Sequence, residues 1–316
     1  MTGVTGPTVV GVDVGGTKTL IGLIRDGAIV DRQRHVTRVG GDDVERVAGL
    51  VAAAVTQWSG QHPVAVGAGF PEYVDPSGRL TSSEVLTWRR QPVDVFAEAF
   101  AGAGFPGLPV VIDSDVRLAA LAEGTFGAGA GHDSFLYVSL GTGLSASFVV
   151  RGRPWAGSRG EAIALGEWPI DGWAAAVTPD GIVPPEPDTL ESFASGSGIA
   201  ARYRRATGGD AAEARTVVAA AVAGDTQATA ILASAGAALG SACAGCVALL
   251  DPSVVILGGG LGTAAVEPLM TALRHAYETR VSRRPGWPPL VPAISPDSGL
   301  LGAALAAQPP TASRQT

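Results

Sequence analysis

Three glycine-rich turns, each directly after a short apolar run, are the segments of this sequence best suited to chemistry. They are Asp13-Val14-Gly15-Gly16-Thr17-Lys18, Leu140-Gly141-Thr142-Gly143 and Leu257-Gly258-Gly259-Gly260. Glycine lets backbone N–H groups approach an anion closely, so such turns can bind phosphate. A single turn of this kind needs no ligand to explain it. Three in succession indicate a nucleotide-binding protein, and no Walker loop occurs in the chain.

Asp13 ends the first apolar run and stands directly before the Gly-Gly-Thr turn. A carboxylate at this place can hold magnesium through water, beside the phosphates of a bound nucleotide. The alternative is an aspartate that only caps its own turn. Because glycines follow it at once, we favour the magnesium role.

The elements that must position these turns alternate between strands and helices. Apolar runs at 8–13, 20–24, 63–70, 109–112, 134–139, 145–150 and 253–257 predict strands. Helical spacing predicts helices over 42–58, 93–101, 117–126, 190–204, 211–223, 230–250, 266–279 and 300–307. The Trp-, Pro- and Gly-rich segment 168–187 predicts a loop. The fold class is therefore α/β, and a strand–turn–strand unit opens both halves of the chain.

Composition narrows the function classes. The net charge is −7 and no Lys/Arg-rich stripe occurs, so we expect no nucleic-acid partner. The uncharged helix 230–250 is long enough for a membrane span, but it consists mainly of Ala, Gly and Ser, which favours a buried core helix. Its Cys243 and Cys246 form a lone CxxC, a weak zinc signal. No secretory leader precedes the first strand, so we expect a cytoplasmic protein with no membrane partner.

Five segments together resemble successive motifs of the ROK family of sugar kinases and sugar-responsive repressors. They are VGVDVGGTKT, VVIDSDVRLAALAEGTFGAG, YVSLGTGLSASFVVRGRPWAG, LESFASGSGIA and DPSVVILGGGLG. The resemblance implies two actin-like (ribonuclease H-like) domains with a nucleotide cleft between them. We expect a smaller domain of residues 1–118 with 295–316 and a larger one of residues 119–294. It also implies ATP and Mg²⁺ as cofactors, a small sugar as substrate, and a homodimer.

Asp115 matches the catalytic aspartate of that family. Glu123, eight residues on, matches the family's helix glutamate and fixes the register on Asp115 rather than Asp113. The resemblance implies that Asp115 removes a proton from the attacking hydroxyl while ATP loses its γ-phosphoryl group. The alternative is an N-cap for the helix that follows, and one residue can do both.

The chain departs from the family pattern where zinc would bind. Many members carry a His and a cluster of Cys shortly before the segment that corresponds to LESFASG. Residues 170–190 contain neither Cys nor His. We therefore expect no structural zinc in this variant.

The sugar-contacting motifs also depart from the family pattern, and most changes introduce carboxylates. Glu84 replaces an Asn, Glu72 replaces a Gly, and Ser114 replaces the Asn that contacts the sugar. The most direct alignment puts Glu167 at the position of a His, whereas a shifted one makes Glu161 the family's conserved Glu. Glu191 is retained and is expected near the anomeric end of the sugar.

The resemblance implies a kinase of a hexose or a hexose-like compound. Carboxylates gathered around a neutral sugar would raise one another's pKa values, and an ammonium group on the ligand would relieve this. We therefore expect phosphorylation of the primary 6-hydroxyl of an amino sugar, with kanosamine suggested by the change at Ser114. The alternatives are an ordinary glucokinase, a kinase of a seven-carbon cyclitol, and a catalytically silent sugar sensor. A repressor is disfavoured, since eight residues before Val9 leave no room for a helix-turn-helix domain.

Overall fold

The chain folds into two compact units, each built around its own β-sheet. A computed structural model describes residues 6–309 except 38, 39, 41, 171–175, 179, 180, 184–188, 212, 265, 282–284, 295 and 296, with the backbone alone at 176–178 and 181–183. The first unit comprises Met1–Ala130, Gly152–Ala162 and Ser295–Thr316, and the second comprises Gly131–Arg151 and Ile163–Ile294. The predicted α/β class is confirmed.

The first unit contains a five-stranded mixed sheet in the order β3-β2-β1-β4-β5. Its strands are β1 (Thr8–Val14), β2 (Lys18–Arg25), β3 (Ala28–Val36), β4 (Val66–Phe70) and β5 (Val110–Ser114). The pairs β1–β2 and β2–β3 are antiparallel, whereas β4 and β5 run parallel to β1. The carboxyl ends of β1, β4 and β5 therefore meet at one edge of the sheet, where polar side chains can gather.

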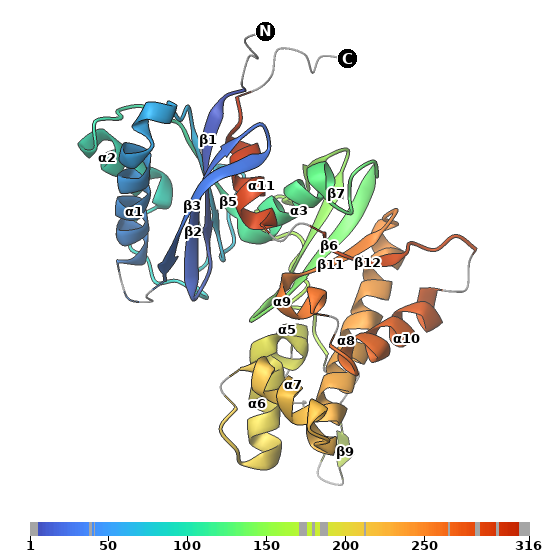
Figure 1. Ribbon diagram of the computed structural model, residues 1–316. Coiled ribbons are helices and arrows are strands. Elements are labelled where there is room, and N and C mark those ends of the chain that lie inside the picture. Colours follow the sequence, from blue (N-terminus) through green and yellow to red (C-terminus); the bar gives the residue numbers. More distant parts are fainter. Residues whose placement is uncertain are drawn as a thin grey trace. The chain divides into compact units, whose positions relative to one another are not determined.

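Helices cover both faces of this sheet (Figure 1). On one face lie α1 (Asp43–Gln57) and α2 (Pro92–Gly102), whose apolar side chains share a core with β1, β2 and β4. On the other face lie α3 (Asp115–Phe126) and α11 (Ser298–Ala307). Gly67 of β4 permits this close contact, because an added Cβ would lie 1.8 Å from the carbonyl oxygen of Ala303 in α11. The short elements η1 (Ser59–Gln61) and β8 (Arg153–Pro154) complete the unit.

The second unit contains strands in the order β12-β11-β6-β7. These are β6 (Ser134–Leu140), β7 (Leu144–Val150), β11 (Val255–Gly258) and β12 (Leu290–Pro292). The remaining elements are β9 (Ala176–Thr178), β10 (Gly181–Val183), α5 (Leu190–Ala194), α6 (Gly196–Thr207), α7 (Ala214–Val222), α8 (Thr226–Leu250), α9 (Gly259–Thr263) and α10 (Leu269–Val281). One large apolar core joins the strands to the helices.

Helix α8 is the uncharged helix that the sequence predicts. It is long and apolar enough to cross a membrane, yet 56% of its most apolar stretch is buried inside the protein. Its Gly236 and Gly240 lie against the backbone of Leu269 and Leu273 in α10, so small residues here serve close helix packing. Cys243 and Cys246 are buried free thiols, and burial raises the pKa of both. We interpret α8 as a core helix.

The structure corrects several sequence-based expectations. The predicted domain boundary at residue 118 falls within α3, which lies wholly in the first compact unit and packs there against α11 through Gly302 and the backbone of Leu118; the division into domains stays a prediction. The single helix predicted over 190–204 is interrupted at Ser195, whose extended backbone and side chain cap α6. The predicted loop 168–187 lies largely outside the described residues, and its described part includes the hairpin of β9 and β10.

Candidate active site

Strand register places the acidic residues of the first unit side by side. Asp13 on β1 pairs with Gly69 on β4, and Gly69 pairs with Asp113 on β5. Asp115 follows as the first residue of α3, and an added Cβ on Gly69 would lie 3.3 Å from its Cα. The missing side chain of Gly69 thus lets Asp115 lie close to the strand ends.

The carboxyl group of Asp115 has a strongly shifted pKa. It is raised from 3.8 to about 7, mainly by burial and then by the negative charge of Asp13, with a smaller contribution from Glu72. The N–H of Val116, 2.6 Å from Oδ1, and the charge of Arg117 lower it in part. Ser114, not Asp115, occupies the N-cap position of α3 and makes no side-chain capping bond. The N-cap alternative for Asp115 is therefore wrong, and its carboxylate is placed to accept a proton.

Asp13 lies against the amino-terminal turn of α11. A Cβ added to Gly299 would lie 2.8 Å from its Cγ, so a larger residue there would displace the Asp13 carboxylate. Burial raises the pKa of Asp13, the charge of Lys18 opposes the shift, and Asp297 adds to it. A half-buried carboxylate whose charge is only partly offset suits a hydrated Mg²⁺ ion. The magnesium role of Asp13 stays a prediction.

The Gly15–Lys18 turn connects β1 to β2 directly beside Asp13. The N–H of Gly15 donates to the carbonyl of Lys18 at 2.9 Å, and the side chains of Thr17 and Lys18 are exposed. An exposed hydroxyl, an ammonium group and glycine backbone on one turn suit a phosphate group. The predicted cofactor role of these residues stays a prediction.

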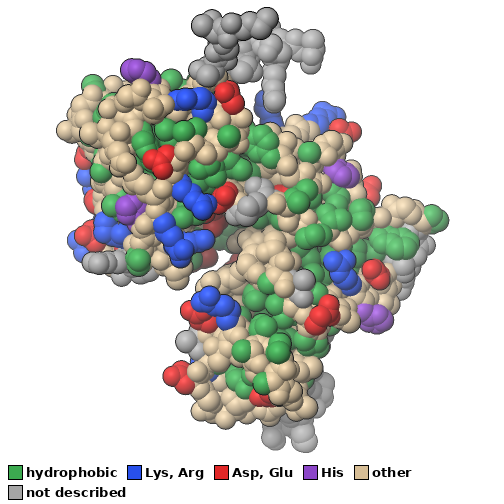
Figure 2. Space-filling view, in the orientation of Figure 1, with side chains coloured by type: hydrophobic (Ala, Val, Ile, Leu, Met, Phe, Trp, Pro, Cys, Tyr) green, Lys and Arg blue, Asp and Glu red, His purple; other side chains and the backbone are tan. Residues whose placement is uncertain are grey.

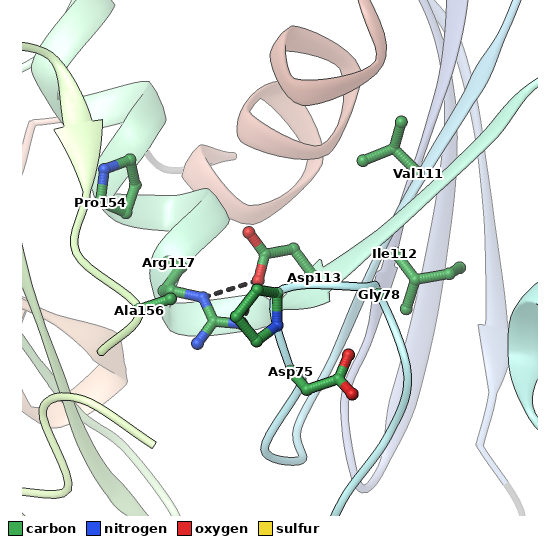
Figure 3. A pocket seen from close by; sticks show the side chains of 9 residues that line it. Asp75, Gly78, Val111, Ile112, Asp113, Arg117, Pro154 and Ala156 are labelled. Atoms are coloured by element: carbon green, nitrogen blue, oxygen red, sulfur yellow. Dashed lines mark hydrogen bonds and ion pairs between the residues drawn. The ribbon is translucent and has the colours of Figure 1, made fainter. Parts of the chain in front are cut away.

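Arg117 forms a buried polar junction that sequence reasoning missed. Its guanidinium group donates to Asp113 in an ion pair, to the carbonyl of Val74 at 2.6 Å and to that of Gly160 at 2.7 Å. Figure 3 shows Arg117 and Asp113 beside Asp75 in a pocket of about 230 Å³. The i, i+4 spacing of Asp113 and Arg117 across the start of α3 was a signal for this pair.

The predicted sugar-contacting residues of the first unit have different surroundings. Glu72 was expected at the rim with its charge toward the substrate, but it is buried and bonded to its own loop. Glu84 is exposed, Ser114 is buried beside Asp115, and Glu161 is paired with Arg159 at 2.6 Å. Glu72 therefore no longer belongs among the carboxylates expected to face the sugar.

The two glycine turns of the second unit lie next to each other. Gly258 of β11 is in register with Ser139 of β6, so the turns that follow these strands are neighbours. Gly259 has φ +77°, and a Cβ there would lie 2.3 Å from the carbonyl oxygen of Leu140. Both the positive φ and the close approach require glycine at this position.

Hydrogen bonds from α6 orient the Gly141–Gly143 turn. The N–H of Gly196 donates to the Gly141 carbonyl at 2.9 Å, and the N–H of Ser197 donates to the Thr142 carbonyl at 3.0 Å. Oε2 of Glu191 accepts the N–H of Leu144 at 2.7 Å, so Glu191 also fixes this turn, whereas Glu167 is exposed. With its carbonyls held by α6, the turn can direct N–H groups toward an anion.

The sequence of this chain matches a known protein family. The model of the ROK family matches residues 9–309, nearly the whole chain. The chain belongs to the ROK family. Its three glycine turns and Asp115 therefore follow one another in the order expected of a ROK protein.

Relatives of this ROK protein include sugar kinases. It is 34% identical over 295 residues to the bifunctional enzyme NanE/NanK of Brucella suis, covering 92% of this chain and 51% of that protein. It is 28% identical to the glucokinase of Streptomyces coelicolor, covering 95% and 98% of the two chains. The chain spans about half the length of these Brucella relatives.

Solved ROK structures share its fold. A ROK hexokinase from Thermus thermophilus superimposes with a TM-score of 0.78 at 31% identity, covering 95% of this chain and 97% of that one. A ROK glucokinase from Streptomyces griseus in complex with glucose and AMPPNP gives 0.75 at 28% identity, covering 95% and 99%. The actin-like architecture that the sequence predicts is confirmed by these neighbours.

Within the described residues, no group of three or more His, Cys, Asp or Glu side chains could hold a metal ion. Much of the segment 170–190, on which the zinc prediction rests, lies outside those residues. The absence of structural zinc stays a prediction.

Proposed function

We propose that this ROK protein transfers the γ-phosphoryl group of ATP to a hydroxyl group of a sugar. The observation that carries the proposal is Asp115, a carboxyl group with a pKa near 7 beside a second buried carboxylate. A general base works best when its pKa lies near the working pH. The glycine turns supply the backbone donors that a nucleotide needs, and the named relatives support sugar as the acceptor.

Asp115 accepts the hydroxyl proton in the proposed reaction. The sugar oxygen forms a bond to the γ-phosphorus while the bond from that phosphorus to the β,γ-bridging oxygen breaks, and ADP leaves with the electron pair. The N–H groups of Gly15 and Gly141 already donate to the carbonyls of Lys18 and Gly143, so the other backbone N–H groups of the three glycine turns would donate to the phosphates. Mg²⁺, bound through water at Asp13, would neutralise phosphate charge.

For the substrate, we propose a hexose phosphorylated on its 6-hydroxyl, with an amino sugar as the specific candidate. Support comes from Glu84 and Glu167, exposed carboxylates at positions where the family pattern has Asn and His. The buried bonds of Glu72 weaken the charge argument, and the relatives include glucokinases. A neutral hexose is therefore the competing candidate, followed by a seven-carbon cyclitol.

Sugar-dependent release of ADP from ATP tests both the proposed kinase activity and the proposed substrate. Values of kcat/KM would be compared for kanosamine, glucosamine, glucose, N-acetylmannosamine and a valiolone-type cyclitol. The amino-sugar proposal predicts that kanosamine or glucosamine is preferred, and that Glu84→Gln and Glu167→Gln each reduce that preference. Preference for glucose, or unchanged selectivity in both variants, would refute it. No sugar-dependent ADP release with any compound would refute the kinase proposal itself.

A further inference from the structure

A buried carboxylate organises the loop that follows β4. The side chain of Glu72 is 5% exposed. Its Oε2 accepts the Ser82 hydroxyl at 2.5 Å and the Glu84 N–H at 2.8 Å, and its Oε1 accepts the N–H groups of Val85 at 2.8 Å and Leu86 at 2.7 Å. No Lys or Arg in the described part of the chain forms an ion pair with it. Four donors therefore take the place of a counter-ion.

The bonded loop has no regular structure of its own. Residues 81–88 form neither helix nor strand, so their backbone N–H groups need partners from elsewhere. The N–H groups of Glu84, Val85 and Leu86 all converge on the one carboxylate. Ser82 accepts two further hydrogen bonds. Its hydroxyl oxygen accepts the N–H of Tyr73, and its carbonyl accepts the indole N–H of Trp88. The shape of the loop is therefore set mainly by side chain-to-backbone contacts.

This loop borders the predicted phosphate turn of the first unit. A Cβ on Gly16 would lie 3.0 Å from Cγ1 of Val85, so the two segments are in close contact. Leu86 is 1% exposed and anchors the loop in the core, whereas the Glu84 side chain is exposed. Glu72 also contributes to the raised pKa of Asp115. The loop thus lies beside the residues to which we assign chemistry.

We propose that Glu72 is a positioning residue that holds loop 82–86 in its sugar-binding shape before the sugar arrives. This inference rests on the proposed kinase function. With a glycine at this position, the three N–H groups would have to bind water or ligand, and the loop would be ordered only on binding. A loop that is already ordered loses less conformational entropy on binding, which lowers the KM for the sugar.

Two variants of Glu72 separate this role from general stability. In Glu72→Gln the amide oxygen can still accept from Val85 and Leu86, but the amide N–H faces the N–H of Glu84. In Glu72→Ala all three backbone donors lose their partner. Glu98→Gln is the matched control, because Glu98 pairs with Arg90 on the exposed surface of the same unit.

Amide hydrogen exchange of residues 84–86 in the ligand-free protein is the first measurement. We expect exchange ~10-fold faster or more in Glu72→Ala, an intermediate effect in Glu72→Gln, and none in Glu98→Gln. Unchanged exchange in Glu72→Ala would overturn the proposal. This readout needs no substrate, so it decides the loop role even if the protein phosphorylates no sugar and the kinase proposal fails.

Steady-state kinetics with ATP and glucose or glucosamine is the second measurement. We expect the KM for the sugar to rise ~10-fold in Glu72→Ala and less in Glu72→Gln, with kcat and the KM for ATP within ~3-fold of wild type. A fall in kcat at unchanged sugar KM would also overturn the proposal, since the loop would then act on the chemical step instead.

Discussion

Replacing Asp115 by Asn should abolish turnover and at the same time stabilise the fold. Loss of a general base costs ~10²–10⁴ in rate. The stabilisation follows from the raised pKa, because a half-buried carboxylate that is hard to ionise opposes folding once the pH is high enough to ionise it. The Asn amide oxygen can keep the hydrogen bond from the Val116 N–H, so little else is lost.

The magnitude follows from the shift from 3.8 to about 7. Each pKa unit is worth about 1.4 kcal/mol, so the full cost of ionisation above pH 7 is about 4 kcal/mol. The side chain is partly exposed, and solvent screening reduces the expected gain to about 1–3 kcal/mol. The folded-state pKa is the higher one, so this cost is absent below pH 3.8, grows as the pH rises from 3.8 to 7, and is fully present above pH 7.

Thermal unfolding of wild type and Asp115→Asn between pH 4 and pH 8 is the assay. The melting temperature of the variant should exceed that of wild type at pH 8, and the difference should shrink toward pH 4. Asp75→Asn is the control, because hydrogen bonds from Ser77 and Arg79 lower the pKa of Asp75 and its removal should act in the opposite direction. A destabilised Asp115→Asn protein at pH 8, or a difference independent of pH, would refute the reasoning.

Three further predictions concern the same sites. The kcat/KM for the sugar should rise with pH along a limb centred near the Asp115 pKa of about 7, since the base must be ionised; a flat profile from pH 5 to 8 would contradict this. Gly259→Ala should lower the melting temperature and weaken ATP binding through its positive φ and its contact with Leu140, whereas Gly260→Ala, with open space around the added Cβ, should melt like wild type. Excess chelator should stop turnover and Mg²⁺ restore it, and elemental analysis should find less than one zinc per chain.

Features set by neighbouring residues could be predicted from the sequence. The β1–β2 hairpin, the strands before each glycine turn and the long apolar helix all appear where apolar spacing placed them. Strand β3 was missed, because the sequence Ala28–Val36 is polar and most of its side chains are exposed at the sheet edge. Without a buried face it lacks the alternation that identifies a strand.

Features set by distant residues could not be predicted in the same way. Glu72 was read as a substrate ligand, yet its partners lie ten to fourteen residues away in an irregular loop. The predicted boundary at residue 118 took no account of the contact between Leu118 and Gly302, because this contact joins segments far apart in the chain. Arg117 was overlooked for the same reason, since two of its acceptors, Val74 and Gly160, are each 43 residues away.

Positive and negative side chains are mixed on the surface of the protein. On the face visible in Figure 2, Lys and Arg side chains are interspersed with Asp and Glu rather than gathered in one patch. A nucleic-acid-binding protein concentrates positive charge on one face or stripe. The net charge of the whole chain is −7, and the absence of a nucleic-acid partner stays a prediction.

Direct detection of the transferred phosphoryl group tests the central claim. The purified protein would be incubated with Mg²⁺, a hexose or amino hexose, and ATP carrying ¹⁸O in its γ-phosphoryl group, and the sugar analysed by mass spectrometry and ³¹P NMR. The kinase proposal predicts a labelled sugar 6-phosphate in equal amount to ADP, and none with Asp115→Asn. Labelled inorganic phosphate without any sugar phosphate, or equal product with Asp115→Asn, would contradict it.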